Sequence, residues 1–156
     1  MSQSPELEIV DYQTEHQPWF EALNRHWIEK YFWMEPIDHE VLQSPAHHII
    51  QHGGATLMAS WNREIVGTVA LKYVAPGIYE FTKMAVDERF QGKKIGLALS
   101  KAALTKAHAL RAQKVILYSN TKLVAAIELY KKIGFQKITL DGPYKRSDIK
   151  MELILS

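Results

Sequence analysis

The segment from Glu88 to Leu99, ERFQGKKIGLAL, combines residue types that could bind an anion. A predicted strand ends before it, a turn with Gly92 follows, and a predicted helix then begins. Because the first backbone N–H groups of a helix have no partners inside it and lie at the positive end of the helix dipole, they form a ready anion site. Lys93 and Lys94 add full positive charges beside it. The alternative is that Gly92 and Gly96 only permit a tight turn and close helix packing, with both lysines facing solvent.

The absence of two phosphate-binding motifs restricts the kind of phosphate ligand that this segment could bind. Neither GxGxxG nor GxxxxGKS/T occurs here, so the segment does not support a dinucleotide fold or a P-loop. A pyrophosphate site of another kind remains the prediction.

Glu80 is the candidate for acid–base chemistry. It lies on the predicted strand 78–86, IYEFTKMAV. In a strand, alternate side chains share one face, and those that would accompany Glu80 are largely apolar: Ile78, Thr82, Met84 and Val86. A carboxyl held on such a surface has a raised pKa, which suits a general base. The alternative is an edge-strand glutamate that faces water or pairs with a lysine.

Strands and helices that alternate along the chain would position these residues. The predicted elements are, in order, strand 6–12, helix 14–32, short helical pieces around Val41 and over 47–52, strands 55–61, 64–74 and 78–86, helix 95–110, strand 114–119, helix 123–133, and closing strands 135–139 and 148–155. The turns between the three middle strands predict an antiparallel meander. The order predicts an α+β fold with one mixed sheet, in a single domain over residues 1–156.

Composition excludes several classes of protein. The 156 residues include no cysteine, which rules out disulfides, thiolate zinc sites and a cysteine nucleophile. The N-terminal MSQSPELEIV has no signal-peptide pattern, and the longest apolar run, Leu123–Ile127, is five residues, so we expect a cytoplasmic protein with no membrane partner. His48 and His52 have the spacing of two ligands on a helix, but no third ligand is evident, and no metal is predicted.

Charge is distributed unevenly along the chain. Residues 1–71 contain three basic and ten acidic side chains, a net charge of −7, whereas residues 72–156 contain sixteen basic and seven acidic ones, a net charge of +9. A polyanion should therefore bind the second half. Nucleic acid would be repelled by the first half, so a compact phosphate-bearing molecule is at least as good a candidate.

Four stretches of the sequence together resemble the GNAT superfamily of N-acetyltransferases. They are the strand YEFTKMAV, the loop QGKKIGLAL, the strand KVILYSN and the segment AIELYKKIGF, and with the element order they cover roughly residues 55–140. In the loop, Gln91 and Gly96 fit the family pattern, but Lys94 occupies the place of the usual middle glycine. A side chain there restricts the turn if a positive φ is needed, or adds charge toward a phosphate. The resemblance implies a GNAT-like, mostly antiparallel central sheet with helices on both faces.

The resemblance also implies a site for acetyl-CoA as the acyl-donor cosubstrate. The backbone of Met84, Ala85 and Val86 would pair with the pantetheine arm, and Asn120 would contact the cosubstrate near it. The residues that would cradle the pyrophosphate are those of the loop and first helical turn: Gln91, Gly92, Lys93, Lys94, Ile95, Gly96 and Leu97. Such a ligand would explain the basic second half.

The chemistry of acetyl transfer needs a base, an oxyanion donor and an acid. An amine with a pKa near ~10 is mostly protonated at neutral pH, so Glu80 is expected to accept its proton. A backbone N–H at Met84 or Ala85 could stabilise the oxyanion if the strand splays there. The resemblance implies that Tyr130 lies close to the sulfur, and we expect it to protonate the leaving thiolate; the alternative is a core aromatic. Without a cysteine to carry the acetyl group, direct attack in a ternary complex is favoured.

The acceptor site is predicted less fully. Family members commonly use the region after the first helix and the loop before the last strand, which makes Phe32, Trp33, Tyr144 and Arg146 candidates for acceptor binding, with Asp148 beside them. The acidic first half hints at a cationic acceptor, a primary amine of a small molecule or a protein lysine. Alternative functions are an acyl-CoA-binding sensor without turnover and a nucleic-acid-binding module. We expect neither nucleic acid nor a membrane as a partner, and a homodimer is left open.

Overall fold

The computed structural model describes residues 6–155, and the predicted segments that include residues 1–5 or 156 extend outside this range. The strands are β1 Leu7–Asp11, β2 Ala55–Trp61, β3 Glu64–Ala75, β4 Ile78–Val86, β5 Lys114–Ser119, β6 Gln136–Ile138 and β7 Ile149–Ile154. The α-helices are α1 Gln17–Tyr31, α2 Pro36–Gln43, α3 Ile95–Ala109 and α4 Val124–Ile133. Short helical turns are η1 Thr14–His16, η2 Ala46–Ile50 and η3 Glu88–Phe90. The order of strands and α-helices agrees with the sequence prediction.

All seven strands form one sheet in the order β1-β2-β3-β4-β5-β7-β6. Strands β1 to β4 are a continuous antiparallel meander. The crossover through α3 makes β5 parallel to β4, and this is the single parallel pair of the sheet described over residues 6–155. Strand β7 then inserts between β5 and β6. The expectation of a mixed, mostly antiparallel sheet is confirmed.

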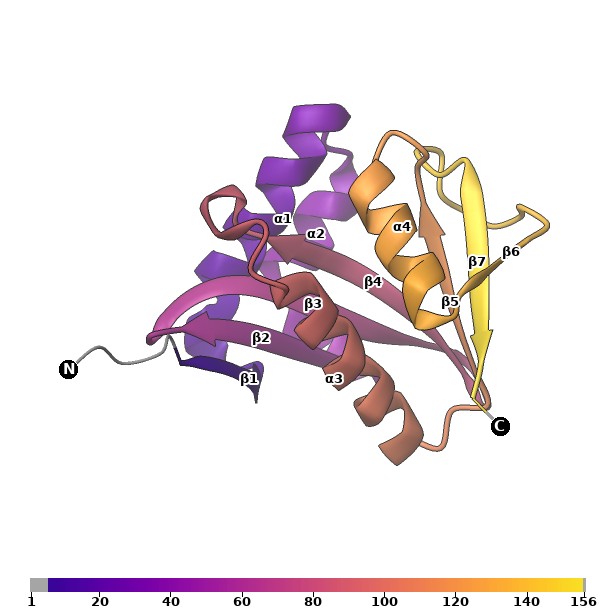
Figure 1. The fold of residues 1–156 in the computed structure, drawn as a ribbon, viewed down its shortest axis with the longest axis horizontal. Coiled ribbons are helices and arrows are strands. Elements are labelled where there is room, and N and C mark those ends of the chain that lie inside the picture. The colour runs from indigo at the N-terminus through magenta and orange to yellow at the C-terminus, as the bar shows by residue number, and fades with distance from the viewer. Residues whose placement is uncertain (1–5, 156) are drawn as a thin grey trace.

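Helices cover both faces of the sheet (Figure 1). On one face α3 and α4 bury the larger core, in which Leu99, Phe81 and Leu117 are at most 2% exposed. On the other face α1 and α2 bury a smaller core around Phe20 and Leu42, both fully buried. Because β3 and β4 are covered on both sides, a polar side chain between the two layers is removed from water.

Gly96 lets α3 approach its neighbours closely. A Cβ on Gly96 would lie 3.3 Å from the Met84 side chain on β4 and 3.4 Å from that of Leu129 on α4. These distances are tighter than ordinary van der Waals contact, so a larger residue would push α3 away from both elements. The glycine that the sequence placed in the anion-binding segment therefore also sets the packing of the helix.

A β-bulge in β4 changes the face that its last residues present. Lys83 has a left-handed backbone with φ 57°, and the pairing of β3 with β4 shifts register between Thr68 and Ala70. Before the bulge Glu80 points towards the α1 and α2 layer, whereas Met84 and Val86 after it pack on the larger core. The prediction that Met84 and Val86 share a face with Glu80 is therefore wrong, because the bulge inserts one residue and reverses the alternation.

Candidate active site

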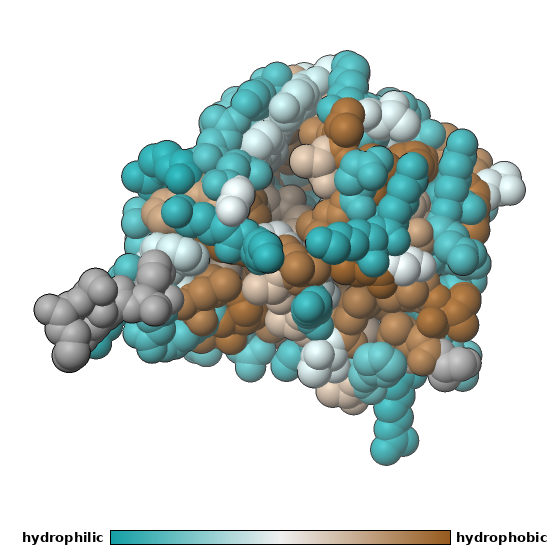
Figure 2. Space-filling model, in the orientation of Figure 1, coloured by the Kyte–Doolittle hydropathy of each residue, from teal (hydrophilic) through white to brown (hydrophobic). Residues whose placement is uncertain are grey.

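A cleft of about 530 Å³ opens where β4 and β5 separate. The two strands pair from Ile78 with Lys114 to Phe81 with Leu117, and beyond this point both continue without a shared ladder. The divergence of their carboxyl ends is visible in Figure 1, and Figure 2 shows a hollow above the centre of the same face. A ligand can therefore reach the backbone of β4 from the side that β5 leaves open.

Glu80 lies at the inner end of this opening, one residue before the pairing ends. Its side chain lines the cleft although the residue is only 5% exposed. Burial raises the pKa of the Glu80 carboxyl, while a hydrogen bond from Tyr144 and the charges of Lys83 and Lys72 oppose the rise. The Tyr144 hydroxyl donates that bond to Glu80 Oε1 over 3.0 Å. A carboxylate with a raised pKa, held in one position, can act as a general base.

The β6–β7 loop, residues 139–148, reaches back across the cleft to α2. Arg146 makes a two-pronged ion pair with Asp38: Nη1 donates to Oδ2 over 2.6 Å and Nη2 to Oδ1 over 2.9 Å. Asp38 is only 4% exposed. Its burial would raise its pKa, but the bonds from Arg146 and from the Glu35 backbone N–H hold that pKa below the ordinary value. The pair thus joins two parts of the chain 108 residues apart.

Local structure prepares both partners of this pair. Asp38 stands at the third position of α2, where its side chain accepts from the backbone N–H of Glu35 over 2.8 Å in a capping box. On the loop side, Asn120 Nδ2 donates to the Arg146 carbonyl over 2.8 Å, and Thr121 bonds both carboxylate oxygens of Asp148. The loop is therefore held by side chains from two separate elements.

Tyr130 combines a buried ring with a position at the cleft. The ring meets those of Phe81 and Phe135 edge-on, with centroids 5.5 and 6.0 Å away, and Tyr130 also lines the cleft. Burial raises the pKa of its hydroxyl, so the group stays protonated at neutral pH. The hydrogen bonds among residues 6–155 include no partner for this hydroxyl, which leaves its proton available to a ligand. Both interpretations of Tyr130, core aromatic and cleft residue, describe parts of its environment.

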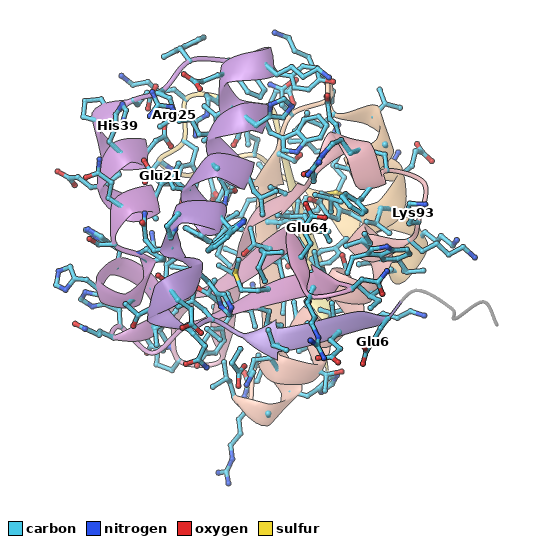
Figure 3. The ribbon with its side chains drawn as sticks, turned by 90° about the vertical axis from the view of Figure 1, so that its left-hand side faces the viewer. Glu6, Glu21, Arg25, His39, Glu64 and Lys93 are labelled. Atoms are coloured by element: carbon cyan, nitrogen blue, oxygen red, sulfur yellow. The ribbon has the colours of Figure 1, made fainter. Side chains whose placement is uncertain are left out.

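The predicted anion site lies at the amino end of α3. Residues Gln91 to Lys94 are all exposed, and Ile95, Gly96 and Leu97 form the first helical turn. Lys93 lies at the periphery of the molecule (Figure 3). Gly92 has a φ of 81°, and no atom lies within 4 Å of the position that a Cβ would take there. The loop thus curls into open space with backbone amides near it, as a diphosphate requires.

Lys94, at the place of the usual middle glycine, has a left-handed backbone. Its φ is 62°, a conformation that costs a non-glycine residue about 1–2 kcal/mol. The loop therefore adopts the left-handed turn despite the lysine side chain, and the packing of the surrounding fold must compensate for the backbone strain.

Two of the predicted cosubstrate contacts, Val86 and Asn120, already have partners within the protein. Met84 lines the cleft, but Ala85 and Val86 do not. The Val86 carbonyl accepts from Trp27 Nε1 over 2.9 Å. Asn120 lines the cleft with its amide already bonded to Arg146. Thr82 and Lys83, which the sequence analysis did not select, line the cleft beside Met84 and extend the accessible β4 backbone towards Glu80.

The acceptor candidates divide into two groups. Phe32, Tyr144 and Arg146 line the cleft, and the Lys122 amine lies 5.5 Å from the centre of the Phe32 ring. Trp33 is 61% exposed and does not line it, because the chain leaves α1 at Phe32 and turns outward before α2.

Sequence reasoning missed Asp38 and Lys83. Asp38 carried a weak signal, the Glu35-Pro36-Ile37-Asp38 start of a helix, but its partner is far along the chain. Lys83 carried none, because a bulge has no fixed sequence pattern apart from glycine.

Within residues 6–155 no group of three metal-ligating side chains is positioned to hold a metal, and none of the described helices is long and apolar enough to cross a membrane.

Comparisons with known proteins agree with this geometry. The model of the acetyltransferase (GNAT) family matches residues 12–135. An acetyltransferase of the GNAT family from Staphylococcus aureus superposes with a TM-score of 0.89 at 19% identity, over 97% of this chain and 100% of that one. PaiA N-acetyltransferase from Thermoplasma acidophilum, solved in complex with coenzyme A, superposes with a TM-score of 0.77 at 20% identity, over 96% and 99% of the two chains.

Curated relatives match over part of their length. The N-alpha-acetyltransferase RimI of Mycobacterium tuberculosis is 33% identical over 106 residues, which are 67% of this chain and 62% of that protein. N-acetylaspartate synthetase of Mus musculus is 31% identical over 93 residues, 59% of this chain and 31% of that protein, so the match spans about a third of this relative. The fold that the sequence motifs predicted is confirmed, and the chain belongs to the acetyltransferase (GNAT) family.

Proposed function

We propose that the chain transfers the acetyl group of acetyl-CoA to a primary amine by direct attack in a ternary complex. The observation that carries this proposal is the position of Glu80: a carboxylate, 5% exposed, at the point where β4 and β5 cease to pair. It lines the same cleft as Tyr130, and the proposed anion-binding loop before α3 is joined to β4 by the short turn η3.

Glu80 acts as the general base. The acceptor amine enters protonated, and its proton passes to Glu80 before or during attack, either directly or through a water molecule. The raised pKa of the carboxyl brings it closer to neutrality, which improves proton transfer. The Tyr144 hydroxyl fixes the orientation of the carboxylate.

The remaining roles fall on the β4 backbone and Tyr130. Acetyl-CoA supplies the thioester; Gln91 to Leu97 bind its pyrophosphate, while Met84 to Val86 and Asn120 contact the pantetheine. The N–H of Met84 or Ala85 stabilises the oxyanion. Tyr130 donates its hydroxyl proton to the leaving thiolate and recovers one from solvent. No cysteine is present to hold the acetyl group, which supports direct transfer.

Replacement of Glu80 by glutamine tests the base. Glu80→Gln keeps the size and polarity of the side chain but removes the basic oxygen, so we expect kcat to fall on the order of a hundredfold or more at neutral pH. The KM for acetyl-CoA should stay nearly unchanged. The measurement is thiol release with a panel of amines, and unchanged turnover would exclude Glu80 as the base.

Glu64→Gln is the matched control. Glu64 is an exposed glutamate on β3 whose carboxylate pairs with Arg89 at 3.1 Å and does not line the cleft. Its replacement should leave kcat within about twofold of wild type, because an exposed ion pair contributes little.

Tyr130→Phe tests the general acid. The ring contacts with Phe81 and Phe135 remain, whereas the proton donor is lost, so we expect kcat to fall about tenfold or more with acetyl-CoA affinity retained. Steady-state kinetics across the pH range measure this, and wild-type values throughout would assign Tyr130 to packing.

The sensor alternative keeps the cosubstrate site without turnover. Acetyl-CoA at a hundred times its Kd would stabilise the fold by roughly 2.7 kcal/mol in either case, so thermal shift alone confirms binding. Thiol release with any amine separates the enzyme from the sensor. Binding to DNA that weakens steeply with salt would favour the nucleic-acid module instead.

The proposal also covers where the enzyme acts, how it assembles and which amine it acetylates. We place the enzyme in the cytoplasm, as one domain over residues 1–156, with a homodimer as a hypothesis for its assembly. Its acceptor is the amine of a small molecule or of a protein lysine.

A further inference from the structure

The cleft is less acidic than the charge of the first half of the chain suggested. Of the acidic residues before position 72, only Glu35 and Asp38 line it. Asp38 is already neutralised by its ion pair with Arg146. Others, such as Glu6 and Glu21, which Figure 3 labels, lie outside the lining. The hint that an acidic wall selects a cationic acceptor therefore loses its basis.

Basic side chains from the second half take the place of that acidic wall. Four of them line the cleft: Lys72, Lys83, Lys145 and Arg146. Lys72 lies opposite Glu80 in the β3–β4 register, but it is exposed at the rim. Lys83 differs from both exposed lysines because it is partly buried and faces the interior of the cleft.

Lys83 has no anionic partner of its own. The ion pairs found among residues 6–155 do not include it, although Glu80 and Asp38 are close enough to favour its charged form. Burial works in the opposite direction and lowers the pKa of the amine. A partly buried ammonium group that makes no direct ion pair is unfavourable unless a bound anion provides one.

The backbone at Lys83 points to the same conclusion. Its φ of 57° lies in the left-handed region, where a lysine is strained and a glycine would not be. Such strain is commonly found where a side chain must be directed into a site. Here the strained residue lines the cleft close enough to Glu80 for the two charges to interact.

The charge that Lys83 can accommodate is a single negative one. Arg146 is already bonded to Asp38 through both of its Nη atoms, and Lys72 and Lys145 are exposed to solvent, so none of the three adds a second buried, unpaired positive charge. The Glu80 carboxylate stands nearby and would repel a dianion such as phosphate more strongly than a singly charged group. A carboxylate is the common biological group with one charge and a planar pair of acceptor oxygens.

We infer that the acceptor is an amine that also carries a carboxylate, an amino-acid-like molecule whose carboxylate binds Lys83 while its amine faces Glu80. The inference rests on acetyl transfer at this site and names its substrate class. Such an acceptor is zwitterionic before attack, in contrast to the cationic acceptor that the sequence hinted at. After the amine loses its proton to Glu80, the carboxylate remains paired with the Lys83 ammonium, which holds the nucleophile in place.

A binding experiment tests the inference separately from turnover. Isothermal titration calorimetry, in the presence of coenzyme A so that no transfer occurs, compares glycine, β-alanine, 4-aminobutyrate, L-alanine and L-lysine with their carboxamides and with spermidine. We expect at least one carboxylate-bearing amine to bind about tenfold or more tightly than its carboxamide. Equal affinity within every pair, preference for spermidine, or no binding to the panel would overturn the inference.

Variants at position 83 assign the preference to this lysine. Lys83→Met removes the charge at similar length, and Lys83→Gly removes it while relieving the left-handed strain, so at least one folded protein is expected. Both should lose the preference for the carboxylate over the carboxamide. Lys101→Met, at an exposed position on α3 outside the cleft, should keep it. A preference that survives both position-83 variants would contradict the role of Lys83.

Thiol release with acetyl-CoA and the same panel distinguishes failure of the proposed acetyl transfer from failure of the carboxylate recognition. Transfer to carboxylate-bearing amines, with the loss in the Lys83 variants mainly in the acceptor KM, supports both. Carboxylate-selective binding without transfer would reject the proposed function and retain the binding site. Transfer to amines regardless of a carboxylate would retain the function and reject the inference.

Discussion

The two sides of the cleft are held in place by different kinds of contact. On the side proposed to bind acetyl-CoA, the donor side, β4 is followed by η3, the exposed loop 91–94 and α3, and the loop's shape depends on the left-handed backbones of Gly92 and Lys94. On the side proposed to bind the amine, the acceptor side, the β6–β7 loop is fixed by hydrogen bonds from Tyr144 to Glu80 and from Arg146 to Asp38, partners 64 and 108 residues away. The donor side is local and made of backbone, whereas the acceptor side is long-range and made of side chains.

This difference matches what each side must recognise. A diphosphate can be bound by backbone N–H groups and a helix terminus, and these need only the right turn. An acceptor must be selected among many amines, which needs specific side chains at fixed positions. Substitutions should therefore act strongly and in a residue-specific way on the acceptor side, and weakly on the donor side.

The largest effect is expected from breaking the ion pair on the acceptor side. Arg146→Met leaves Asp38 buried without its partner, so the free energy of unfolding should fall by about 3 kcal/mol and Tm by roughly 6–12 °C. Denaturant unfolding at neutral pH measures the loss. Because the folded-state pKa of Asp38 is lowered, the pair stabilises the fold above the ordinary Asp pKa and loses that contribution as the pH falls through the lowered one, so the gap between variant and wild type should narrow in acid.

Arg25→Met is the control for this pair. Arg25 pairs with Glu29 at 3.1 Å on the exposed side of α1, where both side chains are about half exposed. Its loss should change the free energy of unfolding by less than about 0.5 kcal/mol. Similar losses for both arginines would mean that the long-range pair has no special role.

A smaller effect is expected when the acceptor loop keeps its place but loses its bond to the base. Tyr144→Phe removes the donor to Glu80, so the pKa of that carboxyl should rise further and the acid limb of kcat/KM should move to higher pH. Below that limb we expect about a tenfold loss of rate relative to wild type, and much less above it. Tyr73→Phe, at an exposed position on β3, should leave the profile unchanged. A Tyr144→Phe loss that is equal at all pH values would contradict the effect on the base.

The smallest effect is expected on the donor side. Lys94→Gly relieves the left-handed strain but adds freedom to the unfolded chain, so the free energy of unfolding should rise by about 1 kcal/mol or less. Lys93→Gly has no such strain to relieve and should lower it slightly. Equilibrium unfolding of both variants measures the difference, and acetyl-CoA titration reports whether the lost charge weakens phosphate binding. Equal responses at the two positions would contradict the strain.

The donor side could be predicted from the sequence because its information is contiguous. Residues 78–97 contain a strand, a glycine turn and a helix start in an unbroken run, and each has a local pattern. Gln91 and Gly92 lie in the turn and Gly96 in the first helical turn, as that run predicted, and the positive φ of Lys94 resolves a point that the sequence left open. Glu80 was found by the same means, although the set of side chains predicted to share its face was wrong beyond Thr82.

The acceptor side could not be predicted in the same way. Tyr144 and Arg146 were selected by family position, but nothing in the sequence pairs them with Glu80 or Asp38. Trp33 was selected with Phe32, yet only Phe32 lines the cleft. Which of two adjacent aromatic residues faces a site depends on the rotation of the chain at a helix end, and that is set by packing.

The sequence alone determined the order of elements and the motifs that place the chain in its family, because strand and helix periods, glycine turns and helix ends are local properties of the chain. Only the tertiary structure decided the face on which Lys83 lies, the pairing of Asp38 with Arg146 and the charge of the cleft. A bulge reverses side-chain alternation without a sequence signature, and a contact across 108 residues forms only when the sheet brings α2 and the β6–β7 loop together.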